Sequence, residues 1–169
     1  AALGTNWEAE LSTDFDGTAL DSESWKPRST GSYDAGGRQC AAPYPSNLSV
    51  SDGEVHLAVT EETDPARIKK AKAAGCEEDA VYRNAMISTE GRATIKSGIV
   101  AARVKFPRGQ GMHGAVWLQS YNKSEIDFVE SYGYGAGVTS VIHVNTGMRI
   151  RVMPGARMLR DRKSTRLNS

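Results

Sequence analysis

The stretch SEIDFVES (124–131) places three carboxylates within six residues of one another: Glu125, Asp127 and Glu130. The apolar residues between them predict a β-strand, whose side chains alternate between two faces. Glu125 and Asp127 then share one face, whereas Glu130 points to the opposite, apolar face. Because a buried unpaired carboxylate is costly, the alternation needs an interruption between Asp127 and Glu130.

A β-bulge at Phe128–Val129 supplies that interruption, since it sets two residues opposite one and shifts the alternation by one position. The two glutamate backbones are then about four strand steps, roughly 13 Å, apart. If each side chain leans about 3.5 Å inward, the carboxyl groups approach to ~6 Å. Retaining glycosidases hold their two carboxylates about 5–5.5 Å apart and inverting ones about 6.5–9.5 Å, so the estimate lies nearer the retaining geometry. The alternative is a charged outer face on an edge strand.

Two neighbouring strands favour a carbohydrate site over that alternative. If the valine and leucine of GAVWLQS (114–120) face the core, Trp117 lies on the side of the carboxylates. By the same alternation His143 of TSVIHVN (139–145) joins that side. An indole ring stacks well on the C–H face of a sugar, and exposed tryptophans are otherwise uncommon.

Short strands separated by turn residues predict the architecture that must position these groups. The helical exception is 64–75, where Asp64 could cap, Pro65 begin and Gly75 end a short helix. Strands recurring about every dozen residues indicate an all-β antiparallel sandwich of one domain. The predicted strands are 54–60, 98–106, 114–120, 125–131 and 139–145.

Two other motifs are interpreted as turns. The glycines of RGQGMHG (108–114) fit a dinucleotide-binding pattern, but the next strand follows too soon for the crossover helix that such a fold needs. DFDG (14–17) lacks the remaining ligands of a calcium loop. We therefore expect no cofactor, and no ligand set in the sequence identifies a structural calcium.

The net charge of +1 divides unevenly along the chain. Residues 147–169 carry seven basic residues and one acid, which leaves 14 basic and 19 acidic residues for the rest. An acidic body argues against a nucleic-acid surface, and no run is long and apolar enough to span a membrane. We expect a monomer without nucleic-acid or membrane partners.

The C-terminal residues DRKSTRLNS (161–169) resemble the translation of a common sequencing-library adapter. A basic nucleic-acid-binding arm is the alternative interpretation. We expect 161–169 to be an artefactual, disordered tail and exclude it from fold reasoning, which leaves 1–160 as the domain.

Cys40 and Cys76 are the two cysteines, and they lack metal-ligand spacing. In a secreted protein they could form a disulfide worth roughly 4 kcal/mol in the chain-entropy model, and in the cytosol they would be free thiols. The residues leave both alternatives open.

EIDFVE (125–130) resembles the E-x-D-x-x-E active-site strand of glycoside hydrolase family 16. Segments 15–25, 47–57 and 84–120 resemble other parts of that family, so the similarity covers most of 7–145. The resemblance implies a curved β-jelly roll with a glycan-binding cleft on its concave face. In this chain the final strands of such a fold would be missing or replaced by the tail.

By position, the resemblance implies Glu125 as nucleophile, Glu130 as general acid/base and Asp127 as their electrostatic partner. It also implies that Trp117 stacks on a sugar, that His143 lies close to the acid/base, and that Asn47 contacts the glycan.

The bulged motif resembles the laminarinase and agarase–carrageenase branches, and the acidic body favours β-1,3-glucan over sulfated galactan. We therefore expect a secreted retaining endo-glycosidase; the alternatives are a galactan hydrolase or a non-catalytic glucan-binding module. Because the final strands would be absent, we expect residues 1–169 alone to be insoluble or molten and inactive.

Overall fold

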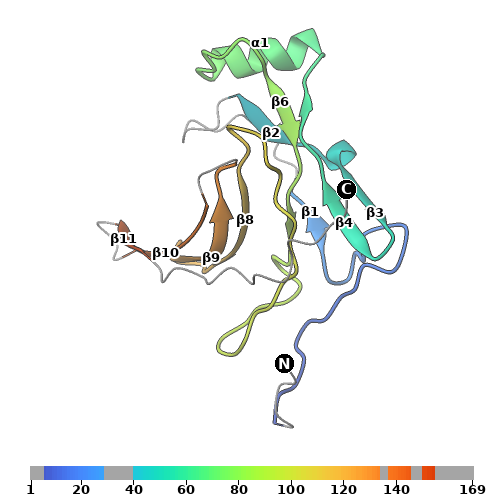
Figure 1. Cartoon of the computed structure of the whole chain (residues 1–169), viewed down its shortest axis with the longest axis vertical. Coiled ribbons are helices and arrows are strands. Elements are labelled where there is room, and N and C mark those ends of the chain that lie inside the picture. The colour runs from blue at the N-terminus through green and yellow to red at the C-terminus, as the bar shows by residue number, and fades with distance from the viewer. Residues whose placement is uncertain (1–5, 29–39, 134–136, 146–149, 155–169) are drawn as a thin grey trace, which may run out of the picture. The chain divides into compact units, whose positions relative to one another are not determined.

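The computed structural model describes residues 6–28, 40–133, 137–145 and the backbone of 150–154. The chain forms two compact units, Ala1–Gly98 and Ile99–Ser169. Strands dominate both units and most of them pair antiparallel, so the predicted all-β class is confirmed (Figure 1). The predicted tail at 161–169 lies outside the described residues.

The first unit contains three small sheets. One parallel pair, β2 with β6, departs from the otherwise antiparallel pairing. The sheets are β1 (Lys26–Pro27) with β7 (Ile87–Ser88), β3 (Leu48–Ser51) with β4 (Glu54–Leu57), and β2 (Ala41–Pro43), β6 (Tyr82–Asn84) and β5 (Thr60–Glu61) in that order.

The strand predicted at 54–60 is two strands, β4 and β5, which belong to different sheets. The chain changes partner at Ala58, whose N–H donates to the carbonyl of Asn47 at 2.8 Å. The Asn47 side-chain amide, at the end of the short 3₁₀ helix η1 (Pro45–Asn47), in turn donates to the carbonyl of Ala58 and the hydroxyl of Thr60. These bonds satisfy the backbone where the strand ladder is interrupted.

The predicted helix is confirmed as α1 (Pro65–Ala73). The Asp64 carboxylate accepts from the N–H of Ala66 at 2.9 Å, which caps the first turn, and Pro65 occupies the first helical position. Gly75, with φ +101°, follows the last turn in a conformation that other residues rarely adopt. At nine residues α1 is too short to cross a bilayer, and the described part of the chain contains no helix that could.

Cys40 and Cys76 form a disulfide, the bridged one of the two thiol states that the sequence left open. Cys76 is buried in the core cluster of the first unit, together with Ala42, Ala71 and Val81. The bond therefore ties the loop before β2 to the segment after α1.

Reducing this disulfide should destabilise the first unit by about 3–4 kcal/mol, because the bond closes a loop with a sequence separation of 36 residues. Urea unfolding of the full-length gene product, followed by tryptophan fluorescence with and without reductant, measures the difference. A Cys40→Ala/Cys76→Ala variant with unchanged stability would contradict the prediction.

The second unit is one antiparallel sheet in the order β11-β10-β9-β8, coloured orange to red in Figure 1. Three of its strands match the predicted ones closely. These three are β8 (Gly114–Gln119), β9 (Glu125–Ser131) and β10 (Val138–Asn145). The fourth strand, β11 (Ile150–Pro154), was not predicted. RGQGMHG forms the predicted turn before β8, with Gly111 at φ +76°.

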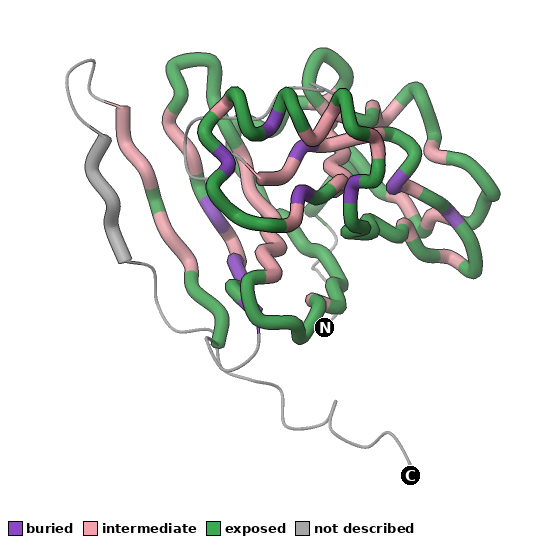
Figure 2. Tube along the Cα trace, turned by 90° about the horizontal axis from the view of Figure 1, so that it is seen from above, coloured by how far each residue is buried: buried purple, intermediate pink, exposed green. Residues whose placement is uncertain are grey.

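The strand predicted at 98–106 is absent, although its apolar alternation is real. The segment has no backbone partner among the described residues, and a strand exists only when its N–H and C=O groups pair. Val100 and Val104 remain 40 % and 44 % exposed. Buried positions are likewise sparse elsewhere along the described chain (Figure 2).

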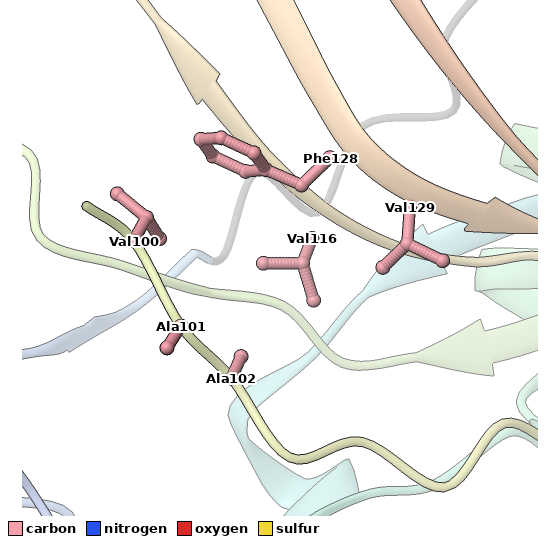
Figure 3. A pocket seen from close by; sticks show the side chains of 6 residues that line it. All are labelled: Val100, Ala101, Ala102, Val116, Phe128 and Val129. Atoms are coloured by element: carbon pink, nitrogen blue, oxygen red, sulfur yellow. The ribbon is translucent and has the colours of Figure 1, made fainter. Parts of the chain in front are cut away.

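Residues 100–102 instead help to line an apolar hollow of about 390 Å³ in the second unit (Figure 3). The other lining residues come from the apolar positions of β8 and β9: Val116, Phe128 and Val129. No carboxylate lines this hollow, so it is not the candidate site.

Candidate active site

The predicted bulge is present in β9. Against β10, Asp127 pairs with Val141 and Glu130 with Thr139, so Phe128 and Val129 lie opposite the single residue Ser140. The register against β8 shifts at the same place, since Val129 pairs with Val116 and Asp127 with Trp117. The Ser140 hydroxyl donates to the carbonyl of Phe128 at 2.6 Å, which satisfies a backbone group that the bulge leaves out of the ladder.

The bulge brings Glu125, Asp127 and Glu130 onto one face of the sheet, where we call them the carboxylate row. Phe128 and Val129 face the apolar hollow on the other side. Asp127 and Glu130 are only 4 % and 8 % exposed. The row also contains every Asp and Glu between Ile99 and Arg160, which is not how acids scattered for solubility are distributed.

Glu125 lies at the more open end of the row. Its Oε2 accepts a hydrogen bond of 2.8 Å from the side-chain amide of Gln119, its cross-strand partner on β8. On β10 it pairs in register with His143. This hydrogen bond holds the Glu125 carboxylate in one orientation, which suits a nucleophile.

Asp127 occupies the middle of the row, and its pKa is raised above the ordinary range. Burial is the largest cause, followed by the negative charges of Glu130 and Glu125; His143 lowers the pKa in part. The Nε2 atom of His143 lies 3.0 Å from Asp127 Oδ2, but this buried oxygen lacks a hydrogen bond of regular geometry. Asp127 therefore keeps a proton to a higher pH than an exposed aspartate.

Glu130 lies at the other end, where two aromatic rings contact one of its oxygens. The Nε2 atom of His113 and the hydroxyl of Tyr132 are each 3.0 Å from Glu130 Oε1. Sequence reasoning missed both residues. The signal was their position, one residue before β8 and one after β9, where the antiparallel register places them opposite each other beside Glu130.

The family resemblance implied that His143 lies close to the acid/base Glu130, whereas its 3.0 Å contact is with Asp127 and its cross-strand partner is Glu125. The histidine that touches Glu130 is His113. The difference follows from the strand register, which pairs His143 with Glu125 on the side of the bulge away from Glu130.

Trp117 lies directly opposite Asp127 in the β8–β9 ladder and is partly exposed, on the face that the alternation predicted. Asn47 belongs to the first unit, is 6 % exposed, and its amide donates to three protein acceptors. These bonds favour a structural role for Asn47, and its glycan contact stays a prediction.

Glu125, Asp127 and His143 each offer one ligand atom within 4.8 Å of the others, close enough to share a divalent cation. A cation there would neutralise Glu125 and occupy the row. A bound cation would therefore compete with the role of Glu125 as a nucleophile, and the expected absence of a cofactor stays a prediction.

Residues 43–149, more than half of the chain, match the family described as Glycosyl hydrolases family 16. The chain belongs to this family, and so to the glycoside hydrolases. A search of curated proteins gave no match.

One similar solved structure is described as "Prominent members of the human gut microbiota express endo-acting O-glycanases to initiate mucin breakdown". The two chains share 20 % identity with a TM-score of 0.56, over 85 % of this chain and 56 % of that one. The likeness confirms the predicted β-sandwich fold. This chain thus spans about half the length of the structure that it matches.

Replacing Asp127 with Asn should raise thermal stability at neutral pH while slowing hydrolysis by about 10²–10³-fold. The pKa of Asp127 is higher in the folded protein than in the unfolded chain. Between these two pKa values the folded protein binds more protons than the unfolded chain, so the free energy of unfolding falls as the pH rises through that range. The advantage of Asp127→Asn should vanish below about pH 3.9, where both states are protonated.

Melting temperatures at several pH values test this. Asp21→Asn is the control, because the pKa of Asp21 is shifted in the opposite direction: the hydrogen bond from the Ser24 hydroxyl lowers it. That variant should gain no stability at neutral pH. An Asp127→Asn variant that melted below the wild type at pH 7 would contradict the account.

Proposed function

We propose that this protein is a retaining endo-glycosidase that hydrolyses β-1,3-glucan of the laminarin type by double displacement. The observation that carries the proposal is the bulge in β9, which aligns Glu125, Asp127 and Glu130 on one face. Double displacement needs one carboxylate as nucleophile and another as acid/base, and different surroundings separate these two roles. Glu125 and Glu130 have different surroundings and lie on either side of Asp127.

In the first step Glu125 attacks the anomeric carbon while Glu130 protonates the departing glycosidic oxygen. The Gln119 amide holds one oxygen of Glu125 and orients the carboxylate for attack. In the second step Glu130 takes a proton from water, which attacks the glycosyl-enzyme and releases Glu125.

Asp127 supports both steps by taking up and giving back a proton, which an asparagine cannot do, rather than by bonding to substrate. A protonated Asp127 removes a negative charge from the middle of the row, so Glu125 can remain ionised beside it. It can also donate a hydrogen bond to a neighbouring carboxylate. Asp127 thus separates the roles of two otherwise similar glutamates.

An uncharged glucan fits the site better than a sulfated galactan. Trp117 offers an indole face beside the row, on which a sugar can stack. The basic side chains in contact with the row are histidines, His113 at Glu130 and His143 at Asp127, and the row itself consists of three acids. The charges at the row disfavour an anionic substrate.

The test is hydrolysis of a panel by the full-length gene product: laminarin, lichenan, agarose, carrageenan and mucin O-glycans. We expect a rapid fall in laminarin viscosity with release of oligosaccharides, as internal cleavage gives. Cleavage of agarose or carrageenan instead would select a galactan hydrolase, and mucin cleavage an activity like that of the similar structure. Binding without cleavage would select a non-catalytic module.

We also propose that the protein is secreted. Polymeric glucan does not enter cells, and the Cys40–Cys76 disulfide is of the kind that persists in oxidising compartments. A signal peptide encoded upstream of Ala1 would support this proposal, and a reduced Cys40–Cys76 pair in the native protein would oppose it.

A further inference from the structure

We propose that His113 and Tyr132 are paired positioning residues that hold Glu130 Oε1 and thereby reserve its Oε2 for proton transfer. The inference rests on the proposed function, since it requires Glu130 to be the acid/base. It assigns the proton to one oxygen and a tautomer to one histidine, neither of which the family match supplies.

The two rings form a unit built by the strand register. Gly114 pairs with Ser131, so the residues just beyond them, His113 and Tyr132, meet across the end of the ladder. Their rings stack with centroids 4.8 Å apart and planes 14° from parallel. The small Ala115 lies opposite Glu130 and leaves room for its side chain.

Close backbone packing fixes this end of the sheet. A Cβ atom on Gly133 would lie 2.1 Å from the carbonyl oxygen of Gly109, so the turn before His113 sits directly against the residue after Tyr132. On Gly114 a Cβ would lie 2.6 Å from the ring of Phe106. His113 and Tyr132 therefore approach Glu130 from a rigid support.

The positions of the protons on Glu130 and His113 are inferred from two contacts with Glu130 Oε1. The Tyr132 hydroxyl donates to Glu130 Oε1 at 3.0 Å, and His113 Nε2 reaches the same oxygen at 3.0 Å. The tautomer that we assign to His113 carries its hydrogen on Nε2, so Oε1 receives two donors, acts as the carbonyl of the acid and leaves the proton of Glu130 on Oε2.

This arrangement serves both steps of the reaction. When the glycosidic C–O bond breaks, its electron pair stays on the departing oxygen, which takes the proton from Oε2. The new carboxylate keeps two hydrogen bonds on Oε1, which offset its charge in a site that is mostly buried. In the second step Oε2 accepts a proton from water, and Oε1 is again unchanged.

Leaving-group dependence separates positioning from mere structural support. Protonation matters for phenyl β-laminaritrioside but little for the 2,4-dinitrophenyl glycoside, whose leaving group departs as an anion. We expect Tyr132→Phe and His113→Leu to lower kcat/KM about tenfold on the phenyl substrate and less than threefold on the dinitrophenyl one. His113→Gln, which keeps an N–H donor, should recover part of the loss.

Matched controls are Tyr121→Phe, at a tyrosine 92 % exposed, and His56→Gln, at an exposed histidine of β4; both should leave the rates unchanged. Equal losses on the two substrates, or no loss on the phenyl one, would overturn the proposal. Hydrolysis of neither glycoside by the wild type would refute the glucan specificity instead.

A second measurement needs no substrate. ¹⁵N NMR of the histidine rings should show neutral His113 as the Nε2–H tautomer, with its signals shifted in Tyr132→Phe and Glu130→Gln. An Nδ1–H tautomer would overturn the proposal whatever glycan the enzyme cleaves, because Nε2 would then accept a hydrogen bond from the Glu130 carboxyl group, with the carboxyl proton on Oε1.

Discussion

Glu125→Gln is expected to lower the rate of glucan hydrolysis by about 10⁴-fold or more, as the loss of a covalent nucleophile does elsewhere. An amide is nearly isosteric with the carboxylate but cannot form the glycosyl-enzyme. It can still pair with Gln119 after a flip, so folding and glycan affinity should be retained. Initial rates on laminarin and glycan binding by calorimetry measure the two effects.

The matched control is Glu54→Gln, an exposed glutamate on β4, whose activity should equal that of the wild type. Azide supplies a further check on a Glu125→Ala variant, because it can replace the missing nucleophile. The product should be an α-glycosyl azide. Wild-type activity in Glu125→Gln would remove Glu125 from the mechanism.

Glu130→Gln should have the second-largest effect, a loss of about 10²–10⁴-fold on glucan. The variant can neither protonate the departing oxygen nor activate water. With a dinitrophenyl glycoside the first step should remain fast, so a burst of dinitrophenol should precede a slow steady state. Stopped-flow absorbance measures both phases.

The absence of a burst, with equal losses on glucan and on the dinitrophenyl glycoside, would contradict an acid/base role for Glu130. The contrast with Glu125→Gln is diagnostic, since losing the nucleophile should abolish the first step for every leaving group. The two variants together therefore distinguish the roles of two glutamates on one strand.

The bulge could be predicted because the sequence contains a local conflict. Strict alternation would have buried Glu130 among apolar side chains, and inserting one residue at Phe128–Val129 resolved that conflict. The strands around it and the capped helix α1 were predictable for a similar reason, since alternation and capping residues act over a few neighbours.

The features that the sequence did not predict depend on partners distant along the chain. Residues 98–106 alternate as a strand does, yet form none, because pairing needs a second backbone that local pattern cannot supply. The contacts of His113 and His143 depend on register, which the bulge shifts by one residue. The split of 54–60 between two sheets depends on hydrogen bonds from Asn47.

Mass spectrometry of a trapped intermediate tests the central claim most directly. The full-length gene product, incubated with a 2-deoxy-2-fluoro laminaribiosyl fluoride, should accumulate a covalent adduct on the peptide containing Glu125, while ¹H NMR of laminarin hydrolysis shows the β-anomer formed first. A label on Asp127 or Glu130, or an α-anomer as the first product, would contradict the assignment of a retaining mechanism to the carboxylate row.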